Sequence, residues 1–238
     1  MNQHPRPKFT WLGHATVYCE LPGGEGLLID PWVSGNPACP EEWKRLPRLD
    51  AVLVTHAHFD HVGDAVDLCR QHRPQLVVAN FETCGWLSAK GVEGCSGMNL
   101  GGTQEVLGLQ VTMVRADHSC GIQDGDQILY GGQAAGYVVR LPGGYTFYHS
   151  GDTALFSDMQ LIAELYRPEL AFLPIGDLFT MDPNQAARAC RYLGVRKVVP
   201  IHWGTFPLLT GTPEQLEKDL ETLGVRCEVI ALKPGETY

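Results

Sequence analysis

The residues best suited to chemistry lie in one short segment, 55–61, which reads Thr-His-Ala-His-Phe-Asp-His. The segment directly follows the apolar run Ala-Val-Leu-Val, which is typical of a buried strand. Neutral imidazole and carboxylate are ligands that borderline divalent metals prefer. On extended backbone His56, His58 and Asp60 would share one face, and a tight turn would carry His61 to a neighbouring site. A surface loop rich in histidine is the alternative, but this density of ligand groups favours a metal site.

Three later segments repeat one pattern, in which a strand-like run ends in a potential metal ligand. The run 111–116 is followed by Asp117-His118, the run 146–149 by Ser150-Gly151-Asp152, and the run 198–201 by His202. Taken singly, the two histidines are as typical of structural positions as of ligands, and an aspartate after glycine is typical of a turn. Taken together, they suggest strand ends that meet at one rim and add His118, Asp152 and His202 to the first segment.

The elements that must position these residues follow a duplicated order of strands, strand–helix units, strands and strand–helix units. We predict strands at 8–12, 15–21, 26–30, 50–54, 75–79, within 98–115, and at 135–141, 145–149, 170–174, 197–201 and 227–232. We predict helices at 64–71, 82–90, 157–166, 182–193 and 212–223, and a glycine-rich loop at 121–132. The duplication indicates an α/β protein with two sheets packed face to face and helices outside. No linker divides the chain, so we expect one domain over 1–238.

Composition narrows the class of partner and the compartment. The chain has 238 residues, 44% of them hydrophobic, and a net charge of −9 without a run of basic residues, which argues against binding long nucleic acid. We expect no membrane span, and residues 1–8 lack the apolar core of a signal peptide. The eight cysteines form no C-x-x-C pair, so we expect reduced thiols in a cytoplasmic protein. Cys120 is notable because it lies close to His118.

The series His56-x-His58-x-Asp60-His61, His118, Gly151-Asp152 and His202 resembles the ligand series of the metallo-β-lactamase superfamily. The resemblance extends over nearly the whole chain. The segments 12–15, 29–31, 148–153 and 173–181 resemble a bacterial and archaeal branch described as metal-dependent hydrolases, which is related to ascorbate-phosphate lactonases and the N-acylphosphatidylethanolamine phospholipase D group. The resemblance implies a four-layer αββα sandwich with two mixed sheets. It is specific for the fold and the metal site and weak for the substrate.

The same resemblance implies a division of the ligands between two divalent metal ions. His56, His58 and His118 would hold the first ion, Asp60, His61 and His202 would hold the second, and Asp152 would bridge both. Zn is the first expectation, and Mn and Fe also accept this set of nitrogen and oxygen ligands. The implied reaction is attack by a metal-bridging hydroxide on a small ester, lactone or phosphodiester. Asp60 has a second candidate role, as the catalytic carboxylate that orients this hydroxide.

Further residues are candidates for supporting roles. Ligating imidazoles usually donate their other N–H to a carboxylate, and we expect Asp30 to be that acceptor, with a turn aspartate as the alternative. His14 and His149 are candidate catalytic residues that could contact the substrate or donate a proton, or else could be buried structural histidines. Asp177 could line the site. An apolar rim, or ordinary core packing, is expected of Trp32, Phe179, Met181, Trp203 and Phe206.

The sequence leaves three alternative functions, each with an observation against it. Iron-dependent redox proteins share the fold implied above, but the di-iron oxidases replace the second histidine of the motif with a carboxylate, and position 58 here is histidine. A non-catalytic, metal-stabilised binding module is disfavoured by the complete ligand set. A serine hydrolase is disfavoured, because the chain has no G-x-S-x-G elbow and Ser150, next to His149, lacks the strand–turn–helix context. We therefore expect a hydrolase that acts on a small molecule, and relatives suggest a homo-oligomer.

Overall fold

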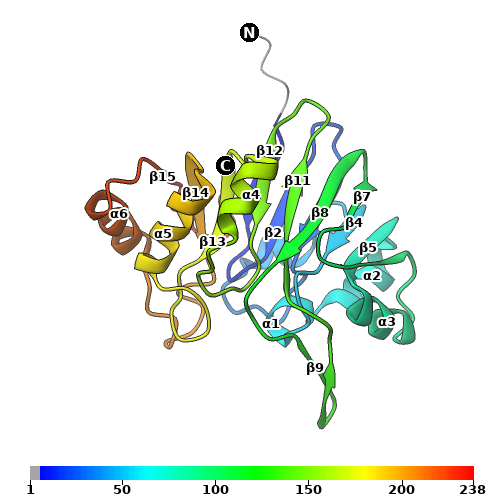
Figure 1. Ribbon diagram of the computed structural model, residues 1–238. Helices are drawn as coiled ribbons and strands as arrows, with labels where there is room; N and C mark the ends of the chain where they lie inside the picture. The colour runs from blue at the N-terminus through cyan, green and yellow to red at the C-terminus, as the bar shows by residue number, and fades with distance from the viewer. Residues whose placement is uncertain (1–5) are drawn as a thin grey trace.

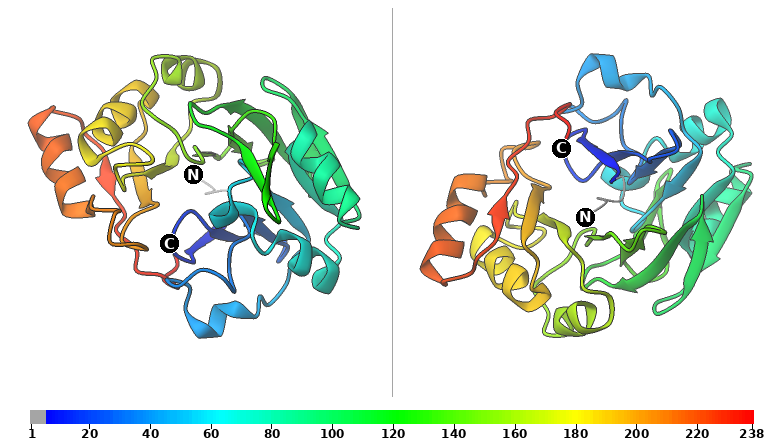
Figure 2. Two further views of the ribbon diagram at one scale, coloured as in Figure 1. Left: turned by 90° about the horizontal axis from the view of Figure 1, so that it is seen from below. Right: turned by 90° about the horizontal axis from the view of Figure 1, so that it is seen from above.

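The computed structural model describes residues 6–238. The prediction that residues 1–8 lack the apolar core of a signal peptide therefore lies partly outside the described residues. Two large sheets pack face to face, with helices on both outer faces (Figures 1 and 2). The first sheet has the spatial order β1 (Lys8–Trp11), β2 (Val17–Glu20), β3 (Gly26–Ile29), β4 (Ala51–Leu53), β5 (Leu76–Asn80), β6 (Cys95–Met98). The second has the order β7 (Thr103–Val106), β8 (Leu109–Arg115), β11 (Ala135–Arg140), β12 (Thr146–His149), β13 (Leu170–Pro174), β14 (Lys197–Ile201), β15 (Glu228–Val229). This is the αββα fold that the sequence predicts.

The outer helices belong to one sheet each. The first sheet carries α2 (Ala65–His72) and α3 (Phe81–Ala89), and the second carries α4 (Met159–Tyr166), α5 (Pro183–Leu193) and α6 (Pro213–Thr222). Two short helical turns, η1 (Glu41–Lys44) and α1 (Phe59–Val62), lie in loops. The predicted start of α5 is confirmed, because Asp182 accepts a hydrogen bond from the amide of Gln185 at 2.7 Å and proline follows it. Within residues 6–238, no helix is long and apolar enough to cross a membrane.

The main core lies between the two sheets. Leu27 and Ile29 of β3 face this core, whereas Leu28 between them packs toward α2 and α3. A strand buried on both faces must be apolar throughout, which explains the uninterrupted run in β3. Phe9 of the first sheet meets Phe147 of the second edge to face, with ring centroids 4.8 Å apart. Each such fully buried side chain contributes about 1.5–3 kcal/mol by removal of apolar surface from water.

The strand directions bring the candidate residues to one end of the molecule. In the first sheet β3, β4, β5 and β6 are parallel, and β1 runs the same way because two antiparallel pairings separate it from β3. In the second sheet β12, β13 and β14 are parallel, and β8 shares their direction for the same reason. The carboxyl ends of these strands therefore form one rim, as the sequence pattern predicts. This rim carries α1 in Figure 1.

Two predicted elements differ in the structure. The stretch 121–132, predicted as a loop, contains a hairpin of β9 (Gly121–Asp124) and β10 (Gln127–Tyr130) that projects from the body next to α1 (Figure 1). The two-residue turn Gly125-Asp126 was the missed signal, since such turns join antiparallel strands. The last strand is shorter than predicted and pairs only at Glu228–Val229. The chain beyond it pairs with β1 instead, where the amide of Tyr238 donates to the carbonyl of Phe9 at 2.8 Å.

Candidate metal centre

Seven predicted side chains converge at the rim, and we call them the His/Asp cluster. They are His56, His58, Asp60, His61, His118, Asp152 and His202. The first four come from a single loop, because β4 ends at Leu53 and α1 begins directly after His58. Asp60 thus lies in a helical turn and not on extended backbone. The prediction that His56, His58 and Asp60 share one face of an extended strand is therefore wrong for Asp60. The helical turn points the side chains of Asp60 and His61 in directions that a strand would not.

Three imidazoles form the first group of the cluster. His56 Nε2 lies 2.9 Å from His58 Nδ1, and His118 Nε2 lies 3.3 Å from the same atom. Burial lowers the pKa of all three rings, most strongly that of the fully buried His56. The rings are therefore neutral near pH 7, which is the form of imidazole that binds a metal ion.

A second group contains Asp60, His61 and His202, together with His14. Burial raises the pKa of Asp60, but hydrogen bonds to His14 and His202 outweigh burial and hold this pKa well below its usual range. Burial likewise lowers the pKa of His202, yet the carboxylates of Asp152 and Asp60 bring it up to about 9. His202 has a positive φ of 54°, a conformation that is uncommon outside glycine and is typical of functional sites.

Asp152 lies between the two groups. Its Oδ2 atom is 3.0 Å from His202 Nε2 and 3.3 Å from His61 Nε2 on one side, and 3.8 Å from His118 Nε2 on the other. Burial raises its pKa, but the neighbouring histidines His202 and His61 outweigh burial and keep it well below the usual range. The preceding Gly151 has φ 60°, and a Cβ there would come within 2.7 Å of Ala135 O and of Thr55 Cβ. Only glycine allows the turn that points Asp152 inward.

Asp30 orients two of the histidines. Its Oδ2 accepts hydrogen bonds from His61 Nδ1 and from the Thr55 hydroxyl, both at 2.8 Å. Since that hydroxyl donates to Asp30, it accepts from His56 Nδ1, which lies 3.1 Å away. Both rings therefore carry a proton on Nδ1 and present Nε2 toward Asp152. The hydrogen bond expected of Asp30 is present.

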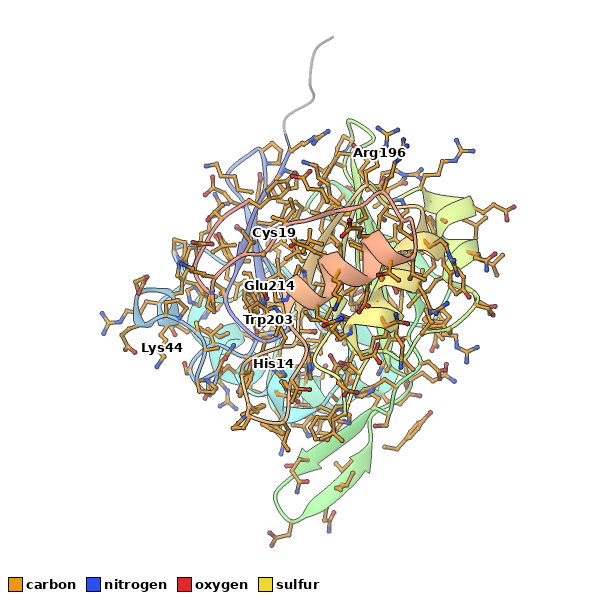
Figure 3. All side chains as sticks on the ribbon, turned by 90° about the vertical axis from the view of Figure 1, so that its left-hand side faces the viewer. His14, Cys19, Lys44, Arg196, Trp203 and Glu214 are labelled. Carbon is orange, nitrogen blue, oxygen red and sulfur yellow. The ribbon has the colours of Figure 1, made fainter. Side chains whose placement is uncertain are left out.

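His14 and His149, the two other candidate histidines, occupy different surroundings. His14 lies in the site, with Nε2 2.9 Å from Asp60 Oδ2 and Nδ1 3.1 Å from Thr205 Oγ1. Figure 3 shows it toward the end of the body from which the hairpin projects. His149 is fully buried, donates from Nε2 to the carbonyl of Ala15 and accepts at Nδ1 from the amide of Gly151. The structure therefore brings His14 to the cluster and engages both nitrogens of His149 with backbone.

Cys120 and Asp177 do not join the cluster. Cys120 is buried behind the His56–His58 loop, where its sulfur accepts from the amide of Ala57 at 3.4 Å and donates to the carbonyl of Gly131 at 3.1 Å. Asp177 is exposed. Neither side chain belongs to the groups of described residues that could hold a metal ion.

The donor set fits divalent metal ions. Among the described residues, three buried polar atoms of the cluster have no hydrogen-bond partner, namely His61 Nε2, Asp152 Oδ1 and His202 Nδ1. Buried polar groups without partners are costly. In the neutral first group, His58 Nδ1 lies 2.9 Å from His56 Nε2 and 3.3 Å from His118 Nε2, and such ring nitrogens repel unless a cation or proton lies between them. Imidazoles and carboxylates in this arrangement are suited to Zn, Mn or Fe.

A cavity of about 510 Å³ opens over the cluster and reaches His58, Asp60, His118, Asp152 and His202. Of the predicted apolar rim, Phe179 and Phe206 line it. Trp32 lies behind it, edge to face with His14 at a centroid distance of 5.1 Å, while Met181 is buried under the second sheet and Trp203 stacks on Trp11. Sequence reasoning missed further lining residues, which are Phe59, Ser119, Gly121, Gln123, Ile128, Leu208 and Leu209.

The model of the beta-lactamase superfamily domain matches residues 26–203. Together with the αββα fold and the His/Asp cluster, this match shows that the chain belongs to the metallo-β-lactamase superfamily. A Koribacter versatilis protein described as a metal-dependent hydrolase is 54% identical over 231 residues, and the alignment covers 97% of each chain. The chain is thus a metal-dependent hydrolase of this superfamily.

Solved structures agree on the fold. A metallo hydrolase from the archaeon Ignicoccus hospitalis superposes with a TM-score of 0.85 at 35% identity, covering 98% of this chain and 97% of that one. A diiron β-hydroxylase from Streptomyces venezuelae superposes with a TM-score of 0.75 at 18% identity, covering 99% of this chain and 54% of that one. The second likeness concerns the fold alone.

Proposed function

We propose that this chain is a binuclear metal-dependent hydrolase that cleaves a small ester, lactone or phosphodiester with water. The observation that supports two ions is the position of Asp152. Its Oδ2 atom lies 3.3 Å from His61 Nε2 and 3.8 Å from His118 Nε2, so one carboxylate faces both groups of the cluster. A carboxylate shared in this way is typical of sites that hold two metal ions close together.

The ligand assignment follows the two groups. His56, His58 and His118 would hold one ion, and Asp60, His61 and His202 the other, with Asp152 shared. Two divalent ions, when bound, supply a water of lowered pKa and polarise the oxygen of the scissile group. Zn is the first choice for the metal, and Mn or Fe fit the same donors.

The side chains supply orientation and proton handling around that chemistry. Asp60 is anionic and partly exposed to the cavity, so its carboxylate can accept a hydrogen bond from the attacking water and direct it. His14 holds this carboxylate from behind, and Asp30 fixes the tautomers of His56 and His61. We assign His14 a positioning role, because both of its ring nitrogens are already engaged.

Metal content and hydrolysis, measured on the same preparation, test this function. Protein purified without added metal is analysed by mass spectrometry and assayed on p-nitrophenyl esters, bis-p-nitrophenyl phosphate and a set of lactones. About two Zn or Mn ions per chain, with turnover that a chelator removes and the metal restores, is the expected result. Two irons with the absorbance of oxidised iron and no hydrolysis would contradict the proposal and favour a redox function.

A further inference from the structure

Outside the His/Asp cluster and His14, the side chains that line the cavity over the cluster are apolar except for Ser119 and Gln123. Six apolar side chains, which we call the apolar collar, line it. They are Phe59, Ile128, Phe179, Phe206, Leu208 and Leu209. They come from α1, from the projecting hairpin and from the loops after β13 and β14, so the loops of both sheets and the hairpin all contribute.

Several collar residues are exposed although they are large and apolar. Phe59 is 59% exposed, Leu208 59% and Ile128 76%. Single exposed apolar residues are ordinary on a protein surface, but a group that converges on one cavity indicates a binding surface. Ile128 belongs to a two-stranded hairpin whose position is maintained by Asp124, which accepts from Trp86 at 3.1 Å and pairs with Lys90 at 2.7 Å. These contacts hold the hairpin in place, and Ile128 on it lines the cavity.

The charge of the cavity lining also bears on the kind of substrate. Of the described residues that line it, none is Lys or Arg, and Ser119 and Gln123 are the polar side chains outside the cluster and His14. Arg115 lines the neighbouring cavity and is 3.7 Å from Asp117. A phosphodiester carries its negative charge on two oxygens, and no Lys or Arg of the lining would add to the two proposed ions in binding them, whereas a carboxylic ester develops negative charge on one oxygen, which the ions alone can stabilise. The lining therefore suits a neutral substrate.

We propose that the substrate is a neutral carboxylic ester, linear or cyclic, with an apolar substituent that lies against the apolar collar. This rests on the proposed hydrolase function. Water adds its oxygen to the carbonyl carbon, the bond from that carbon to the alcohol oxygen breaks, and the alcohol oxygen takes a proton, which leaves a carboxylic acid and an alcohol. The collar contributes binding energy along the chain of the substrate, remote from the reacting carbon.

A matched set of esters, followed by titration of the released acid, tests the substrate class. Ethyl octanoate and octyl acetate place the apolar chain on opposite sides of the ester bond, and ethyl acetate lacks it. At least one long ester should exceed ethyl acetate in kcat/KM by about 100-fold. Complete burial of the substrate chain would give a larger ratio, but the collar is half exposed. Monoethyl octanedioate, which ends the same chain in a carboxylate, should be at least about 10-fold poorer than ethyl octanoate.

Variants identify the collar as the cause. Ile128→Ser should lower the ratio of kcat/KM for the preferred long ester to that for ethyl acetate by about fivefold. Leu129→Ser is the matched control, because Leu129 lies on the same strand but lines only the neighbouring cavity. The control should leave the ratio as it is in the unaltered protein.

A ligand that cannot be hydrolysed separates the two proposals. Octan-2-one should bind more tightly than butan-2-one in calorimetry, with a negative heat-capacity change from apolar burial. Tight binding of octan-2-one without turnover of any ester would leave the collar in place and overturn the hydrolase function. Equal rates for long and short esters, preference for bis-p-nitrophenyl phosphate, or a carboxylate-ended chain accepted as well as the neutral one would overturn the substrate class alone.

Discussion

His14 Nε2 lies 2.9 Å from Asp60 Oδ2, and the same ring is 3.1 Å from the Thr205 hydroxyl through its other nitrogen. Burial lowers the pKa of His14 to about 4, so the ring is neutral at pH 7. An ionised carboxylate cannot donate, so the proton of the ring lies on Nε2 and the hydroxyl of Thr205 donates to Nδ1. The orientation of Asp60 therefore depends on a residue far from it in the sequence, because β2, β3 and β4 lie between His14 and Asp60.

Replacement of His14 should reduce the rate more than the metal content. His14→Ala removes the donor to Asp60, and we expect kcat to fall by about 10–100-fold with KM little changed. His14→Gln, whose amide can donate to the same oxygen, should recover part of this loss. The measurements are steady-state kinetics and metal content on both variants. Full kcat in His14→Ala, or no recovery in His14→Gln, would contradict the positioning role.

Removal of Asp152 should abolish both metal binding and activity. Asp152→Ala deletes the carboxylate that faces both groups and leaves His61 and His202 without their shared anion. We expect the metal content to drop below one ion per chain, with kcat/KM lowered by at least about 1000-fold. Asp117→Ala, an exposed aspartate next to His118, is the control and should keep its metal. Full occupancy by two ions in Asp152→Ala would show that the bridging assignment is wrong.

Asp30 should act on metal affinity through the rings that it orients. Asp30→Asn keeps the shape of the side chain and tolerates the positive φ of 53° at this position. The aspartate accepts three hydrogen bonds, from the His61 ring, the Thr55 hydroxyl and the Thr55 amide. The side-chain amide of asparagine has only one oxygen and can no longer accept all three. Metal affinity, measured by competition with a chelator, should fall by about 10–100-fold. Asp50→Asn, at a site remote from the cluster that also accepts a backbone hydrogen bond, should leave the affinity unchanged.

His149 should matter for stability and not for metal binding. His149→Ala leaves a cavity and removes the partners of Ala15 O and Gly151 N, which we expect to cost about 3 kcal/mol of folding free energy. For a chain of this size, that corresponds to a decrease in Tm of about 9 °C. Calorimetric unfolding and metal analysis of the same sample check both parts. Loss of one ion at unchanged Tm would assign His149 to the site instead.

The sequence predicted the architecture well because its signals were local. Short β-branched runs marked the buried strands, and Asp182-Pro183 marked the start of α5. The rim could be anticipated from strands that each end in a ligand, and all seven members of the His/Asp cluster come together there. Position along the chain could not show that His14 turns toward Asp60 and that His149 turns toward backbone, since each follows or ends a strand.

The walls of the cavity were harder to anticipate than its floor. The hairpin was missed because all four residues of β10 are exposed. A strand without a buried face has no need for alternating apolar and polar residues, so its sequence shows no such pattern. Phe59 and Leu208 are exposed apolar residues in a helical turn and a loop, and sequence alone gives no reason to assign them to one surface. Side chains that meet only through tertiary structure carry no local signal.

The His/Asp cluster also has a consequence for folding kinetics. His56 follows a strand of the first sheet and His202 follows a strand of the second, so both sheets must be formed and packed before the ligands meet. Ions captured at this last stage stabilise contacts that are absent from the folding transition state. Bound metal should therefore slow unfolding and leave the refolding rate nearly unchanged, which stopped-flow experiments with and without a chelator can measure. In this view the metal determines how long each molecule survives, while the packing of the two sheets determines how fast it forms.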